Sequence, residues 1–169
     1  LPLTLAIIDG MVVRVGRENY ILPTLSIVQF FKPKREQLST VAGRGELVNN
    51  RGTLMPLVRL HRLYDTPPAS PDPTEGLTVI VESDGRMFAL LVDDLIGQQQ
   101  VVIKSLGPYF AKVKGLAGAT ILGDGRVGLI LDIGGVFKAY RDPAHYPDET
   151  IAAGAAPALP LPEAAVSIN

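Results

Sequence analysis

Hydrophobic and polar positions alternate in short runs along this chain, and polar turns separate the runs. Val13 and Val15 flank Arg14, which is the two-residue period of a strand with one buried face. The polar stretch 16–19 separates this run from the apolar run 20–22, so the pattern predicts a β-hairpin. Further strands are predicted on the same grounds over 3–8, 47–48, 54–60, 77–81, 88–92 and 99–103.

Glycine, proline and polar clusters modify this pattern. Asp9 and Gly10 are expected to break the first run. Pro56 lies inside a predicted strand, and because proline cannot donate to a ladder the strand is expected at a sheet edge or bulged there. Residues 24–31 place apolar side chains at near-helical spacing, which predicts one or two helical turns. Residues 34–41 are polar and predict a loop.

One pattern occurs twice. A polar turn followed by an apolar strand lies at 49–60 and again, 73 residues later, at 123–133. That match is the first anchor of a candidate repeat. A second anchor, at an offset of 68, aligns 20–22 with 88–90 and 27–28 with 95–96. Two anchors in the same order indicate a duplication. The alternative, that any two antiparallel hairpins look alike in sequence, stays open at this point.

The repeat and the strand spacing predict the fold class. Five short strands in each half favour an all-β fold of two pseudo-symmetric, five-stranded barrels, because closure removes exposed edge strands. A barrel of about 60 residues is marginal on its own, so the two barrels are expected to pack on each other and share apolar contacts.

Composition narrows the class of protein. Hydrophobic residues make up 47% of the 169 residues and charged residues 20%, which is typical of a globular chain. The net charge of −1, without a basic stripe, argues against a nucleic-acid or acidic-membrane binder. The chain has no cysteine, so it has no disulfide or thiolate metal site. Its apolar runs are shorter than the roughly 18 residues of a membrane span. The start lacks Met and a basic region, which suggests a piece of a longer protein rather than a signal peptide.

Candidate catalytic groups are sparse. Asp93 and Asp94 are the one carboxylate pair in an apolar setting, but neighbours at a strand end point in different directions, so a solvated turn is predicted. His61 and His145 each lack a second ligand at metal-binding spacing. Asp124 between two glycines would repel phosphate. We therefore expect no active site, no metal and no cofactor, and the remaining candidate function is recognition of another protein.

Several short motifs lie in order between residues 1 and 140: LPLTLAIIDGM at 1–11, VG at 15–16, YILP at 20–23, ELVNNRG at 46–52, MPLVRL at 55–60, LLVDDLIG at 90–97 and LDI at 131–133. In this order and spacing they resemble the C-terminal regulatory, CheW-like domain of the bacterial chemotaxis histidine kinase CheA. The later motifs also resemble the signature that this domain shares with the coupling protein CheW.

The resemblance implies a division of the chain. Residues 1–10 would be a linker strand from a preceding kinase domain. Residues 11–76 would form the first small SH3-like barrel, completed by 134–146, and residues 77–133 the second. Residues 147–169, which are rich in alanine and proline, are expected to be a flexible tail.

The resemblance also implies a function. The domain would have no catalysis of its own, would bind the coupling protein CheW and would transmit receptor state to the kinase. Its other partners would be the cytoplasmic tips of chemoreceptors and the rest of the kinase chain, at membrane-associated receptor arrays in the cytoplasm, without nucleic acid and without membrane insertion.

The implied contact residues lie in both halves. By family likeness, Val79, Val92 and Leu95 would contact the coupling protein. By pseudo-symmetry, Thr24 and Ile27 are candidates for a second, weaker contact, although Thr24 stands where the matching place is apolar.

Two alternatives are weaker. A free-standing CheW-type coupling protein shares the fold but would not need the lead-in 1–10. An oligonucleotide-binding small barrel needs exposed aromatics on a basic face, and the phenylalanines and tyrosines here lie mainly in apolar runs.

Overall fold

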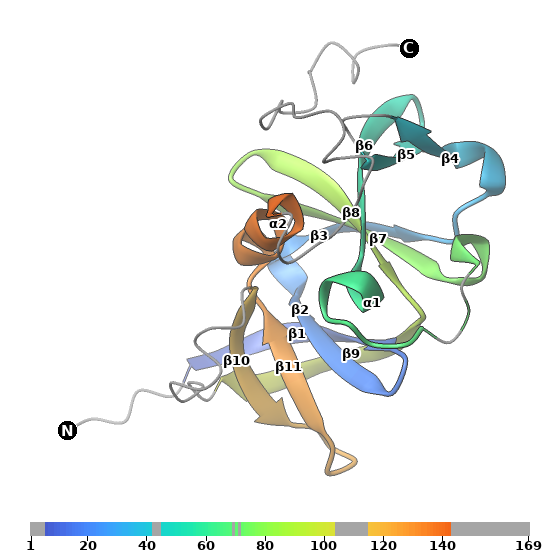
Figure 1. The fold of residues 1–169 in the computed structure, drawn as a ribbon. Coiled ribbons are helices and arrows are strands. Elements are labelled where there is room, and N and C mark those ends of the chain that lie inside the picture. Colours follow the sequence, from blue (N-terminus) through green and yellow to red (C-terminus); the bar gives the residue numbers. More distant parts are fainter. Residues whose placement is uncertain (1–5, 42–44, 69, 71, 104–114, 143–169) are drawn as a thin grey trace.

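The computed structural model describes residues 6–41, 45–68, 70, 72–103 and 115–142. In this part of the chain, eleven strands form two sheets. Figure 1 shows how they are arranged. The predicted all-β class and its two units are confirmed. The helical elements are short: α1 (Leu60–Leu63), α2 (Ile133–Arg141) and the 3-10 turns η1 (Thr24–Ser26), η2 (Arg35–Gln37) and η3 (Pro73–Glu75).

The first sheet has five strands. Its order is β10 (Leu116–Ile121), β11 (Val127–Leu131), β2 (Glu18–Pro23), β1 (Ala6–Val15) and β9 (Asp94–Ile103). Neighbours are antiparallel except β11 and β2, which are parallel. The two outer strands, β9 and β10, also lie against each other, so the sheet curls toward a barrel.

The second sheet has six strands. Its order is β3 (Ile27–Phe31), β7 (Leu77–Ser83), β8 (Arg86–Val92), β6 (Thr53–Arg59), β5 (Gly45–Asn50) and β4 (Leu38–Val41). Here β6 and β8 are the parallel pair. The loop predicted for 34–41 is wrong, because β4 pairs with β5 and Leu38 packs against the apolar interior of this sheet.

Each sheet takes strands from both predicted halves. The hairpin β1–β2 joins β9, β10 and β11, whereas β3 to β6 join the hairpin β7–β8. The sequential division into 11–76 and 77–133 is therefore corrected, because the chain crosses to the other sheet after β2 and again after β8. Residues 6–10 belong to β1 and pair with β9, so Asp9 and Gly10 do not break the strand. The tail predicted at 147–169 lies outside the described residues.

The strand pairing confirms the duplication. Leu57 of β6 pairs with Ala89 of β8 in parallel, and Ile130 of β11 pairs with Ile21 of β2 in parallel. The offset of 73 carries Leu57 onto Ile130, and the offset of 68 carries Ile21 onto Ala89. The two sheets therefore repeat the same pairing in the same register.

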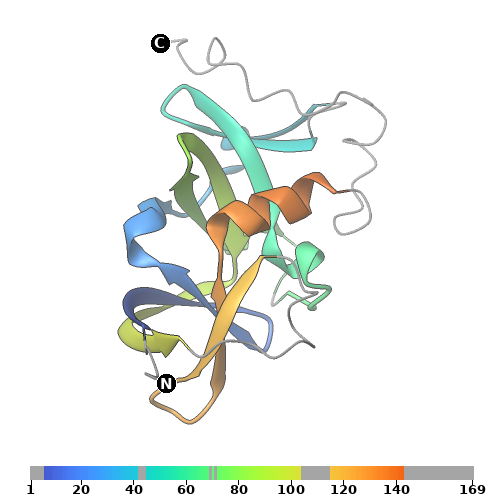
Figure 2. The same ribbon diagram turned by 90° about the vertical axis from the view of Figure 1, so that its left-hand side faces the viewer.

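Three apolar clusters hold the sheets together. One cluster lies within the first sheet and includes Val12 and Ile21, and another lies within the second and includes Ile80. The largest is shared, and the side chains from β1, β2, β6, β7, β8, β11 and α2 that meet in it include Val13 and Val136. Figure 2 shows α2 running across the junction between the sheets. The expected shared apolar contact is confirmed.

Two local predictions are corrected. The segment 24–31 forms only the single turn η1 before β3, because its later residues pair with β7. The strand that contains Pro56 is central rather than at an edge. Its ladder with β8 begins at Leu57, one residue after the proline, so the missing N–H interrupts no pairing with β8.

Candidate interaction surface

The five residues expected to contact a partner lie in different environments. Val79 and Val92 are only 0% and 1% exposed and belong to the shared core. Because both faces of β7 and β8 are covered at these positions, neither side chain can touch a partner. The expected direct contact of Val79 and Val92 with a coupling protein is therefore corrected. Leu95 is 37% exposed. Thr24 and Ile27 are half-buried.

Leu95 lies on β9, an outer strand of the first sheet, opposite Val13. The register shifts between Val12 and Val13, so Ile96 is an extra residue without an opposite partner on β1. Such a β-bulge turns a side chain away from the regular alternation. Ile96 is 54% exposed, and two neighbouring apolar side chains therefore meet solvent. We call Leu95 and Ile96 the β9 patch.

The second sheet has an equivalent surface on β3. Ile27 pairs with Val81, and the register shift that follows leaves Val28 as the extra residue, 51% exposed. The offset of 68 carries these residues onto Leu95 and the bulged position after it. Leu25, in the turn before β3, is fully exposed. We call Leu25, Ile27 and Val28 the β3 patch.

Hydrogen bonds fix the chain just before the β9 patch. The Asp93 carboxylate accepts a bond from the Gly16 N–H at 2.5 Å, and the Asp93 N–H donates to the Arg14 carbonyl at 2.8 Å. The Asp94 carboxylate accepts from the Leu95 N–H at 2.8 Å and faces Arg14 at 3.5 Å. The solvated turn predicted for the aspartates is thus corrected for Asp93, which supports the β1–β2 turn.

Gly16 permits this arrangement. Its φ of +61° lies in the left-handed region, and an added Cβ would collide with the Pro67 carbonyl oxygen. The β1–β2 turn, the connector after α1 and the start of β9 therefore meet at one fixed point.

A family model for the CheW-like domain matches residues 9–141. The chain belongs to the CheW-like domain family. It is 48% identical over 142 residues to the chemotaxis protein CheA of Klebsiella aerogenes, covering 84% of this chain and 22% of that protein. It is 49% identical over 133 residues to the chemotaxis protein CheA of Salmonella typhimurium, covering 79% and 20%. The chain thus spans about a fifth of the length of these relatives.

A solved structure supports the fold of this CheW-like domain. The scaffolding protein TtCheW from Thermoanaerobacter tengcongensis has a TM-score of 0.60 and 17% identity over 75% of this chain and 90% of that chain. The bacterial chemotaxis relationship expected from the motifs is confirmed by the family model and the CheA relatives.

The contact residues expected from the sequence do not include Leu25, Val28 and Ile96, whose side chains are exposed. A signal for two of them was present, because 27–28 and 95–96 are adjacent apolar pairs within strands. Neighbouring residues on a strand point to opposite faces, so both members of such a pair are buried only if both faces are covered. On an outer strand, one member meets solvent or the strand bulges.

The described residues of the CheW-like domain were also compared with the requirements of a metal site, a titrating histidine and a membrane span. These contain no group of three His, Cys, Asp or Glu side chains placed to hold a metal ion. Burial, and then the charges of Arg59 and Arg62, lower the pKa of His61, so its imidazole is neutral at pH 7. His145 lies outside the described residues. None of the described helices has the length and apolar character to cross a bilayer.

Proposed function

We propose that this CheW-like domain is the non-catalytic regulatory domain of a CheA-type chemotaxis kinase, and that its β9 patch binds a CheW-type coupling protein. The observation that carries the proposal is Leu95 beside the bulged Ile96: two exposed apolar side chains on an outer strand of a domain whose relatives are CheA proteins. Identity of 48–49% to those CheA proteins favours this assignment over a free-standing coupling protein.

The chemistry of the patch suits a reversible contact. Leu95 and Ile96 gain free energy when a partner removes them from water, and a few such anchors dominate a small interface. Val79 and Val92 enter the proposal only as part of the shared core, since they are buried. A patch of this size fits an interface below about 1,200 Å², which is typical of transient signalling contacts.

The β3 patch supplies a second, weaker contact of the same type. Ile27 is the pseudo-symmetric counterpart of Leu95, and Val28 is the counterpart of Ile96. Thr24 is half-buried, so its part in this contact is limited to the edge. The two patches lie on different sheets that share one core. In this proposal the domain is a common support for the coupling protein, the receptor tips and the rest of the kinase chain. These contacts form at receptor arrays in the cytoplasm.

Titration calorimetry with the cognate CheW-type coupling protein tests the β9 patch. Leu95→Asp places a charge in the apolar contact and is expected to weaken binding by about 1–3 kcal/mol, or roughly 5- to 150-fold. Val28→Asp is expected to weaken binding less. Val41→Asp is the matched control, because Val41 on β4 is 40% exposed and belongs to neither patch.

Circular dichroism must show that each variant keeps the wild-type fold. If the Leu95→Asp variant binds the coupling protein with wild-type affinity, the interface lies elsewhere on the domain. Absence of any binding by the wild-type domain at micromolar concentration would overturn the proposed function itself.

A further inference from the structure

We propose that a groove at the end of the first sheet binds an acidic protein segment that carries a large apolar side chain. The groove shares only Ile96 with the β9 patch, and its arginines lie outside that patch. The groove consists of two adjoining hollows of about 610 and 430 Å³ that share Arg14, Asn19 and Arg126. It lies between the β1–β2 turn and the β10–β11 turn, and we call it the arginine groove.

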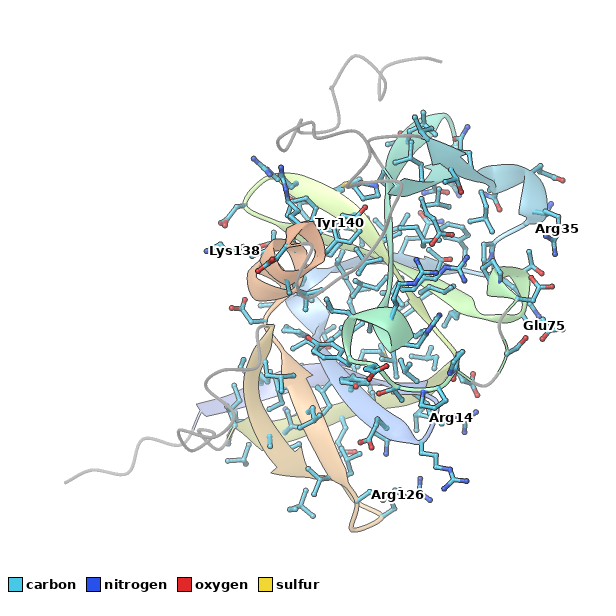
Figure 3. The ribbon with its side chains drawn as sticks, in the orientation of Figure 1. Arg14, Arg35, Glu75, Arg126, Lys138 and Tyr140 are labelled. Carbon is cyan, nitrogen blue, oxygen red and sulfur yellow. The ribbon has the colours of Figure 1, made fainter. Side chains whose placement is uncertain are left out.

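Three arginines line the arginine groove: Arg14 from β1, Arg17 from the β1–β2 turn and Arg126 from the β10–β11 turn. Figure 3 shows Arg14 and Arg126 at the same end of the molecule. Arg17, in the β1–β2 turn, lines the same hollow as both of them. Glu18 and Asp124 also line the groove, and Asp94 faces Arg14 from outside it.

The existing ion pairs are weak enough to be exchanged. Arg14 lies 3.5 Å from Asp94, with side chains 42% and 57% exposed, and Arg126 lies 4.0 Å from Asp124, with side chains 66% and 60% exposed. Arg17 has no ion-pair partner within the part of the chain that the structure describes. Exposed pairs of this kind contribute little free energy, so carboxylates of a partner can replace or join them.

Apolar side chains form part of the walls of the groove. Ile96 and Val127 are each 54% exposed, and Leu122, which also lines the groove, is 7% exposed. A small inorganic anion would leave these side chains in water. An acidic segment with an apolar residue satisfies both the guanidinium groups and the walls, which is the charge and apolar complementarity that selects this occupant.

The second sheet does not repeat this charge pattern. The offset of 68 carries Arg14 onto Glu82 and Arg17 onto Gly85, and the offset of 73 carries Arg126 onto Thr53. The equivalent turns of the second sheet carry their arginines, Arg51 and Arg86, at positions that correspond to Asp124 and Glu18 in the groove. The three guanidinium groups are a property of this groove rather than a requirement of the repeated architecture.

Selection of displayed random 12-residue peptides on the full 169-residue protein tests the inference. Peptides retained by the wild type and lost on the double variant Arg17→Glu, Arg126→Glu are expected to carry net negative charge and at least one large apolar residue. A selected peptide should bind the double variant at least tenfold more weakly in a fluorescence titration. Arg35→Glu is the matched control, because Arg35 of η2 is in an exposed ion pair with Asp72 at 3.2 Å and neither residue lines the groove.

Four outcomes would overturn the inference. They are failure to enrich any peptide, enrichment of peptides without an acidic bias, equal binding to the double variant, and complete competition by low-millimolar inorganic phosphate, which would indicate a simple anion pocket. The double variant should keep its affinity for the coupling protein, and Leu95→Asp should keep its affinity for the peptide. Those two controls separate a failure of this site from a failure of the proposed function.

Discussion

Thr78 is a polar side chain in an apolar environment. It lies on β7 with no exposed surface, between Leu91 of β8 and Phe31 of β3 in the strand register. Its hydroxyl has no hydrogen-bond partner among the described residues. An unsatisfied buried hydroxyl typically costs about 1–3 kcal/mol of folding free energy. Removing this hydroxyl should therefore raise the free energy of unfolding.

Replacing this hydroxyl by a methyl group tests that interpretation. Thr78→Val keeps the shape and the β-branched character of the side chain and is expected to raise the free energy of unfolding by about 1 kcal/mol. Urea unfolding should show a higher midpoint with an unchanged m-value. Thr40→Val on β4 is the control, because Thr40 is exposed and no gain is expected there. A lower midpoint for Thr78→Val would mean that the hydroxyl is hydrogen-bonded.

The environments of single residues also explain why the interaction surface was only partly predictable from the sequence. Strand alternation correctly puts Val79 and Val81 on one face of β7, but it does not tell whether the opposite face is solvent. Here Ile80 is also buried, in the cluster of the second sheet. The exposed Leu95 could be predicted from the family motif, whereas the exposure of Ile96 depends on a bulge set by pairing with β1.

At the scale of elements, one ion pair fastens the β5–β6 hairpin. Arg59 binds Glu46 through two short bonds, Nε to Oε1 at 2.7 Å and Nη2 to Oε2 at 2.6 Å. The two side chains are only 14% and 17% exposed, and Arg62 of α1 approaches the same carboxylate at 3.7 Å. A bidentate, partly buried pair is stronger than a solvated one. It ties both strands of the hairpin to α1.

A double-mutant cycle measures this pair. Glu46→Gln leaves Arg59 without its charged partner and is expected to lower the free energy of unfolding by about 2 kcal/mol. With Arg59→Met as the second substitution, the interaction energy is expected to be about 1–3 kcal/mol by chemical denaturation. The cycle for the exposed pair of Arg35 and Asp72 is the control, with an expected value below about 1 kcal/mol. Equal interaction energies in the two cycles would contradict the role given to burial.

Elements with strong turn signals could be predicted, and elements defined by distant partners could not. Hairpins around 49–52 and 84–85 were confirmed, because Arg51, Gly52, Asp84 and Gly85 all adopt positive φ as tight hairpin turns require. β4 was missed because a polar segment becomes a strand only when β5 pairs with it.

At the scale of the whole molecule, the two repeats exchange strands, so each sheet contains strands from both of them. Each repeat contributes a hairpin to one sheet and the following strands to the other. The repeat was visible in the sequence, but the exchange was not. The offsets of 68 and 73 are the same whether a hairpin pairs with strands of its own repeat or of the other one. Only the three-dimensional pairing separates the two arrangements.

The exchange predicts how fragments behave. A cut at residue 76 leaves β1 and β2 without β9, β10 and β11, and leaves β3 to β6 without β7 and β8. Neither fragment 1–76 nor fragment 77–169 then completes a sheet or the shared core. Both fragments are expected to be unfolded alone, because the missing strands carry the apolar partners that would offset the chain entropy of folding.

Mixing the two fragments restores every strand, so an equimolar mixture is expected to form a complex with the dispersed amide spectrum of the intact domain. Two-dimensional NMR of each fragment alone and of the mixture provides the measurement. Fragment 24–93, of similar length, holds all six strands of the second sheet and is expected to keep more β-structure by circular dichroism than either half. Cooperative unfolding by 1–76 or 77–169 alone would instead support two sequential barrels. The absence of any complex on mixing would mean that the exchanged strands cannot find their partners once the covalent connection at residue 76 is lost.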